Sequence, residues 1–281
     1  MSGTTAESIA STVGSSTVEN RNGDWTVVVS RRGKHRRKAC NLKAVAQEEP
    51  WAPVDSEIDP VRVAKLLQKM ESSMKKLENS KFFQAFMDQL VNPQILLKFS
   101  QILSSESQFL MLIYGIGSIE SYDSPCLQLS LALLLKRKFD WIGEIEAFDP
   151  VISVTESKVL ETLGCRVLAI NEQGKREASK PILFFMPHCE AYLYDNLIEV
   201  NRKAQLLNRM VIFGNSFEEY DHFVSIIEGN ELADSARYLL DTRRFVEEVR
   251  IETVSEEYFM AFNGTSWHFF HLDHSMELGE P

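Results

Sequence analysis

The glycine turn that follows the apolar run Phe109 to Tyr114 constrains the fold more than any other feature of the sequence. Six consecutive apolar residues are typical of a strand that is buried on both faces of a sheet. The turn Gly115-Ile-Gly117-Ser118 comes next, and glycines allow the tight turn that leads from such a strand into a helix. We therefore expect a Rossmann-like α/β unit in the middle of the chain.

Later segments repeat this alternation of strand and helix. Further strands are expected over Ile145–Pro150, Cys165–Ile170, Pro181–Cys189 and Met210–Ser216, and helices over Ser124–Lys138, Thr155–Leu163 and Glu190–Asn201. Ser124 is expected to be the N-cap of its helix with Pro125 in the first helical position, and Gly164 to follow the end of another helix. The pattern predicts a doubly wound, mostly parallel sheet with right-handed crossovers. Weaker signals favour helices over Phe217–Ile227 and Ala233–Leu240, and strands over Val246–Val254 and His268–Leu272.

The chain divides into three parts. Residues 1–59 are expected to be a disordered basic arm and linker, because their first half is rich in Ser, Thr, Gly and Asn. Residues 60–107 show apolar positions at helical spacing, so we expect a helical segment that packs on the sheet, with one helix from Pro60 to Leu77. Residues 108–275 form the Rossmann-like domain.

Positive charge is concentrated in the N-terminal arm, at Arg31, Arg32, Lys34, Arg36, Arg37 and Lys38. We interpret this run as a nuclear import signal; the alternative is a solvated basic arm without a role. Residues 51–281 hold 22 Lys and Arg against 35 Asp and Glu, so direct nucleic-acid binding by the folded part is not expected. The apolar runs are too short to span a membrane, and four widely spaced cysteines are typical of free thiols in a reducing compartment.

Ligands of open parallel sheets bind at the carboxyl ends of the strands, and polar or glycine residues follow several of the expected strands. The candidate ligand-binding residues are Gly115, Gly117, Ser118, Asp149, His188 and Asn215. Glu120 stands where a dinucleotide-binding turn has its third glycine, and its charge would repel a pyrophosphate. A sulfonium ligand such as S-adenosylmethionine fits better. The alternative is that the glycines only form the turn and Asp149 caps the following loop.

No residue set predicts a catalytic or metal site. His188 and Cys189 are neighbours on an expected strand, so their side chains should point to opposite faces and cannot pair as base and nucleophile. His268, His271 and His274 lack a cysteine partner or an H-E-x-x-H spacing, so no metal is expected.

Five segments in order resemble the Sensitivity to Red Light Reduced (SRR1-like) family: Tyr114 to Ser121, Phe148 to Val151, Leu160 to Val167, Phe185 to Cys189 and Ile212 to Phe217. The late segment Phe262 to His268 and the early Trp25 to Val29 beside the basic run fit as well, and the whole chain is similar to the plant members.

The resemblance implies a regulator of phytochrome B signalling and of light input to the circadian clock, required for normal clock-gene expression and found in nucleus and cytoplasm. It would act through signalling or clock proteins, or through a bound small molecule. The family brings no catalytic residues. The alternative hypothesis is a methyltransferase-like enzyme that binds S-adenosylmethionine at the Gly115–Gly117 turn.

Overall fold

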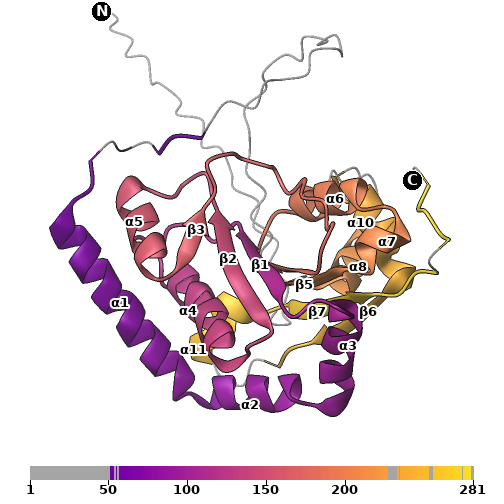
Figure 1. Cartoon of the computed structure of the whole chain (residues 1–281), viewed down its shortest axis with the longest axis horizontal. Helices are drawn as coiled ribbons and strands as arrows, with labels where there is room; N and C mark the ends of the chain where they lie inside the picture. The colour runs from indigo at the N-terminus through magenta and orange to yellow at the C-terminus, as the bar shows by residue number, and fades with distance from the viewer. Residues whose placement is uncertain are drawn as a thin grey trace, which may run out of the picture. The chain divides into compact units, whose positions relative to one another are not determined.

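The computed structural model describes residues 51–53, 55, 57–226, 233, 235–252, 256–273 and 275–279 (Figure 1). Residues 1–50 of the predicted arm and linker, including the basic run, lie outside the described residues, whereas residues 51–53, 55 and 57–59 of this segment are described and Trp51 is ordered against Phe148 and Pro150. The strands are β1 (Phe109–Tyr114), β2 (Ile142–Phe148), β3 (Cys165–Val167), β4 (Ile182–Met186), β5 (Met210–Asn215), β6 (Val246–Arg250) and β7 (Thr265–Phe270). The helices are α1 (Pro60–Glu78), α2 (Lys81–Leu90), α3 (Pro93–Leu103), α4 (Asp123–Lys138), α5 (Val154–Thr162), α6 (Ala191–Val200), α7 (Ala204–Leu207), α8 (Phe217–Ile226), α10 (Arg237–Thr242) and α11 (Glu256–Phe262).

The strands form one sheet in the order β3-β2-β1-β4-β5-β7-β6. The first five strands of the chain pair in parallel, and β7 runs antiparallel to both of its neighbours. The chain winds outward from β1 to β3, then returns to the other side of β1 and continues through β4 and β5. This is the doubly wound, mostly parallel arrangement that the sequence predicts.

The central strands separate two hydrophobic cores. Along β1, Phe109, Met111 and Ile113 face one core, whereas the alternate residues Leu110 and Leu112 face the other. This alternation explains the continuous apolar run, because successive side chains of a strand point to opposite faces. Helices α1 to α5 and α11 contribute to the first core, and α6, α7, α8 and α10 to the second (Figure 1).

Several expected boundaries are wrong, since β2 begins at Ile142 rather than Ile145, β4 ends at Met186 rather than Cys189, and β6 ends at Arg250 rather than Val254. Helix α4 begins at Asp123, because the Ser124 hydroxyl donates to the carbonyl of Met260 instead of capping the helix, and Pro125 is tolerated within the first turn. Strand β3, at the edge of the sheet, ends at Val167 rather than at Ile170. Strand β7 begins at Thr265 rather than at His268. The short helices α7 and α11 are not predicted from the sequence.

Other expectations are confirmed. Helix α1 begins at Pro60, where the Asp59 carboxylate accepts from two backbone amides. Gly164 follows the C-cap of α5 with a φ of 89°, in the left-handed region that favours glycine. None of the helices within the described residues is both long and apolar enough to cross a membrane.

Candidate functional site

A shallow pocket of about 240 Å³ opens at the carboxyl end of the sheet, between β1 and β4. The connections from these neighbouring strands leave toward opposite faces, since α4 belongs to one core and α6 to the other. Such a switch point is where open α/β sheets bind ligands. The pocket is lined by Tyr114, Gly115, Phe148, Asp149, Pro150, Asn171, Gly174, His188, Cys189, Glu190, Tyr192 and Leu193.

Strand register brings the candidate residues to this edge. Tyr114 pairs with Phe148, so Gly115 and Asp149 follow their strands at the same level. Of the six predicted ligand-binding residues, Gly115, Asp149 and His188 line the pocket, whereas Gly117, Ser118 and Asn215 do not. Ligand contact by any of the six remains a prediction, but their contacts within the chain can be described.

Asp149 holds the turn after β1. One carboxylate oxygen accepts from the amide of Gly117 at 2.8 Å, and the other accepts from the amide of Val151 at 2.9 Å. The residue is 7% exposed. The bond from Val151 fits the structural alternative, in which Asp149 caps its own loop. The bond from Gly117 also connects this loop to the turn after β1.

Both glycines of the turn have positive φ angles, 66° at Gly115 and 74° at Gly117, which side chains rarely adopt. A Cβ atom on Gly115 would also lie 2.5 Å from the Cys189 sulfur, far inside van der Waals contact. A Cβ on Gly117 would meet Pro125 at 3.3 Å. Backbone geometry and packing therefore account for glycine at Gly115 without a ligand.

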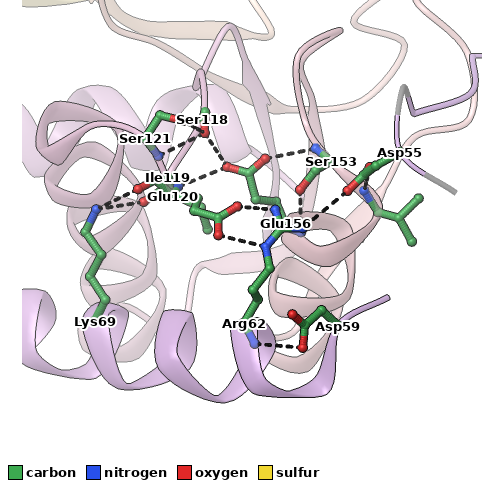
Figure 2. A network of polar contacts seen from close by, with 11 residues as sticks. Asp55, Asp59, Arg62, Lys69, Ser118, Ile119, Glu120, Ser121, Ser153 and Glu156 are labelled. Atoms are coloured by element: carbon green, nitrogen blue, oxygen red, sulfur yellow. Dashed lines mark hydrogen bonds and ion pairs between the residues drawn. The ribbon is translucent and has the colours of Figure 1, made fainter. Parts of the chain in front are cut away.

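The carboxylate of Glu156 accepts hydrogen bonds from the rest of the turn (Figure 2). Its carboxylate accepts from the Ser118 hydroxyl at 2.7 Å, from the amide of Glu120 at 3.0 Å and from the amide of Ser153 at 2.9 Å. The last contact completes a capping box with the Ser153 side chain at the start of α5. Ser118 is thus engaged by the protein itself.

Helix α1 closes the outer side of the turn (Figure 2). The Arg62 guanidinium donates to both carboxylate oxygens of Glu120, at 2.9 and 2.5 Å, and this interaction lowers the pKa of Glu120. Lys69 donates to the carbonyls of Ile119, Glu120 and Tyr122. The Glu120 charge, which we expect to repel a pyrophosphate, is paired with Arg62 on the α1 side.

His188 and Asn215 form a second rigid group. The Asn215 amide oxygen accepts from the backbone of His188 at 2.6 Å, and its nitrogen donates to the carbonyl of Cys189 and the hydroxyl of Tyr220. These contacts hold His188 at a φ of 60°. β4 ends before His188, so the expectation that this residue lies on an extended strand is wrong.

Both ring nitrogens of His188 have a hydrogen-bond partner. Nε2 lies 3.1 Å from the carbonyl of Asn263, which can only accept, so Nε2 carries the proton and Nδ1 accepts from Gln128 at 3.4 Å. Although part of the residue reaches solvent, packing around the ring lowers its pKa, which favours the neutral form. The Cys189 thiol points elsewhere, donating to the carbonyl of Tyr114 at 3.2 Å. The two side chains contact different partners, although not for the expected reason, because His188 lies beyond the end of β4.

Burial and nearby charges keep the Cys189 thiol protonated. Burial raises its pKa, and the charges of Asp149 and Glu190 raise it further. A thiol in such an environment is a poor nucleophile. Cys126 and Cys165 also have pKa values raised by burial.

The structure describes two of the three C-terminal histidines, His268 and His271, which have different surroundings. His268 is buried, with Nδ1 3.2 Å from the carbonyl of Ile212, whereas His271 is half-exposed beside Glu247. His274 lies outside the described residues. Within the part of the chain that the structure describes, no three His, Cys, Asp or Glu side chains meet as metal ligands would.

The sequence reasoning missed several residues of the pocket. Tyr192 and Glu190 enter it from the start of α6, and Asn171 and Gly174 from the loop after β3. Behind them, the Tyr114 hydroxyl donates to Glu172, which pairs with Arg176. Glu190 and Tyr192 follow β4, so the rule that ligands bind after strand ends would have included them. The loop after β3 carries no comparable signal.

Comparison with known proteins gives a consistent family match. The SRR1 domain model matches residues 63–269. Protein SENSITIVITY TO RED LIGHT REDUCED 1 of Arabidopsis thaliana is 48% identical over 268 residues, which cover 93% of this chain and 97% of that protein. An SRR1-like protein of Mus musculus is 39% identical over 123 residues, 41% of this chain and 47% of its own length.

Solved structures are more distant. A Klebsiella pneumoniae protein assigned as an O-methyltransferase aligns with a TM-score of 0.41 at 9% identity, over 77% of this chain and 92% of that one. The 23S rRNA methyltransferase ErmE aligns with a TM-score of 0.36 at 11% identity, over 66% of this chain and 71% of that one.

Proposed function

The chain belongs to the SRR1 family, and from this membership we propose that it is a regulator of red-light signalling. The observation that carries the proposal is the 48% identity to the Arabidopsis protein named for reduced sensitivity to red light, which extends over 97% of that protein. Nearly the whole relative is matched, and the SRR1 domain model spans the sheet edge with the pocket. More specifically, we propose that the chain acts in phytochrome B signalling and in light input to the circadian clock, in nucleus and cytoplasm.

Binding fits this role better than turnover. The polar groups of Ser118, Asp149 and Asn215 hold neighbouring loops in place, and both ring nitrogens of His188 have partners. Groups held in this way are suited to keeping the edge of a pocket rigid. We propose that the protein relays its signal through partner proteins or a bound small molecule.

Complementation in plants tests the proposal. Arabidopsis seedlings that lack their own relative would express this chain, and hypocotyl length would be measured under continuous red light, under far-red light and in darkness. We expect rescue under red light, with no change in darkness. A luciferase reporter driven by a clock promoter would measure the period in the same lines. Failure to rescue the red-light response, despite normal protein accumulation, would contradict the proposal.

A methyltransferase-like enzyme is the second candidate. The feature that favours it is the position of the pocket at the β1–β4 switch point, where such a cofactor would bind. Its volume of about 240 Å³ lies below the range of about 300–1,000 Å³ typical of small-molecule sites, so the pocket would have to open for a nucleoside cofactor. Titration calorimetry with S-adenosylmethionine measures this directly, and absence of binding would exclude the second candidate.

A further inference from the structure

The fixed charges that line the pocket at the β1–β4 switch point are all negative. Two of its lining residues, Asp149 and Glu190, carry carboxylates, and none of them is Lys or Arg. His188 adds no fixed charge, because its environment lowers its pKa. The guanidinium of Arg176, which does not line the pocket, pairs with Glu172 and Glu146.

One positive feature opposes these carboxylates. Helix α6 begins at the pocket, and the amino end of a helix is equivalent to about half a positive charge. Two full negative charges outweigh it.

Within the described residues, the charge of Glu190 has one structural role, a favourable interaction with the amino end of α6. Glu190 is the N-cap residue of α6, yet its side chain makes no capping hydrogen bond. Asp149 uses two of its roughly four lone-pair positions on the amides of Gly117 and Val151, which leaves acceptor capacity for a ligand. The carboxylates can therefore serve a bound molecule without loss of the fold.

Aromatic residues also belong to the lining, and Tyr192 is the exposed one among them. Tyr192 is 44% exposed, and Tyr114 and Phe148 are buried residues of the same pocket. Ring faces attract organic cations, and quaternary ammonium groups are often recognised by aromatic residues. The small volume excludes a dinucleotide, and the negative charge disfavours any phosphate.

We propose that this pocket binds a small organic cation of the ammonium or sulfonium class. The inference takes from the proposed function only the idea that a small molecule is bound. It is tested on the purified protein and the red-light role is tested in plants, so the two can fail separately.

Ligands of matched shape separate the effect of ligand charge on binding from the effect of ligand shape. Choline and 3,3-dimethylbutan-1-ol have nearly the same shape, but only choline is charged. Trimethylsulfonium tests the sulfonium class, and inorganic phosphate and NAD test the opposite charge. Binding to the full chain would be followed by calorimetry and by the fluorescence of Trp51, whose ring packs on Phe148 and whose indole donates to the carbonyl of Pro150. Trp51→Phe identifies the contribution of this residue to the signal.

We expect choline and trimethylsulfonium to bind at least about tenfold more tightly than the neutral alcohol, and phosphate and NAD not to bind. Equal affinity of choline and its neutral isostere, tighter binding of phosphate or NAD, or absence of cation binding up to about 10 mM would each overturn the proposal.

Two substitutions locate the site. Glu190→Gln should weaken choline binding by about fivefold to tenfold, because it removes a pocket carboxylate that makes no capping hydrogen bond to α6. Glu177→Gln is the matched control, since it removes the same charge from an exposed position that lines a different hollow. Both variants should keep the melting temperature of the parent chain. Equal weakening in both variants would show that choline responds only to the overall charge, and would overturn the assignment.

Discussion

The backbone amide of Gly117 donates to the carboxylate of Asp149 at 2.8 Å, so the loop after β2 fixes the turn after β1. Asp149→Ala removes the acceptors of the Gly117 and Val151 amides. We expect a loss of roughly 1–3 kcal/mol in the free energy of unfolding for each amide left without a partner, measured by urea denaturation. Asp149→Asn keeps one acceptor oxygen and should lose less. Equal stability of the alanine variant and the parent would show that water replaces the carboxylate.

The sequence predicts the elements whose signal is local. Phe109 to Tyr114 is read correctly because every residue of a doubly buried strand is apolar, and Gly164 because the end of a helix needs a left-handed residue. The start of α4 is misread because the Ser124 hydroxyl has a partner 136 positions away, at Met260. The start of β7 is misread because Thr265 and Ser266 are polar yet fully buried.

The candidate site is predictable only in part, for the same reason. Strand ends can be counted along the chain, so Gly115, Asp149 and His188 are found. Whether their polar groups face a ligand or the protein depends on partners far away in sequence. The Arg62–Glu120 pair spans 58 positions, and no pattern of spacing predicts it.

Gly115→Ala combines two costs, a positive φ angle and a clash with the Cys189 sulfur. We expect a loss of more than about 2 kcal/mol in the free energy of unfolding, since the backbone cost alone is about 1–2 kcal/mol. Gly164→Ala is the matched control, because it has a φ of 89° and open space around the added methyl group. Cys189→Ala in the Gly115→Ala background should restore only the part of the free energy of unfolding that the steric clash removes. No recovery would mean that backbone strain accounts for the whole effect.

The basic run of the N-terminal arm predicts active nuclear import. Replacement of Arg36, Arg37 and Lys38 with Ala should lower the nuclear fraction of the protein by severalfold, measured by microscopy of a fusion too large to diffuse through the nuclear pore. Lys65→Ala with Lys75→Ala is the control, because both lysines are exposed on the folded body. An unchanged nuclear fraction in the arm variant would contradict an import signal in this run.

Stability should fall as the pH drops from about 6.5 toward 4, because His268 is fully buried between β5 and β6. Burial lowers its pKa from 6.5 to about 4, although the nearby charge of Glu248 opposes the shift. Within this window the unfolded chain binds a proton that the folded chain does not, so the free energy of unfolding declines by at most about 1.4 kcal/mol per pH unit from this group. Below about pH 4 both states are protonated, and this contribution no longer changes.

Urea denaturation between pH 5 and pH 6.5 measures this slope. The pKa of Glu248 is also lowered, because contacts with His268, Ser216 and Ser266 outweigh its burial, and from an ordinary value of 4.5 it titrates below this range. His188 has a lowered pKa as well and adds a slope of the same sign. His268→Asn should therefore reduce the slope without abolishing it, whereas the slope should persist in His222→Asn, which removes an exposed imidazole. An unchanged slope in His268→Asn would show that the buried ring is already protonated at pH 5, with Glu248 as its partner.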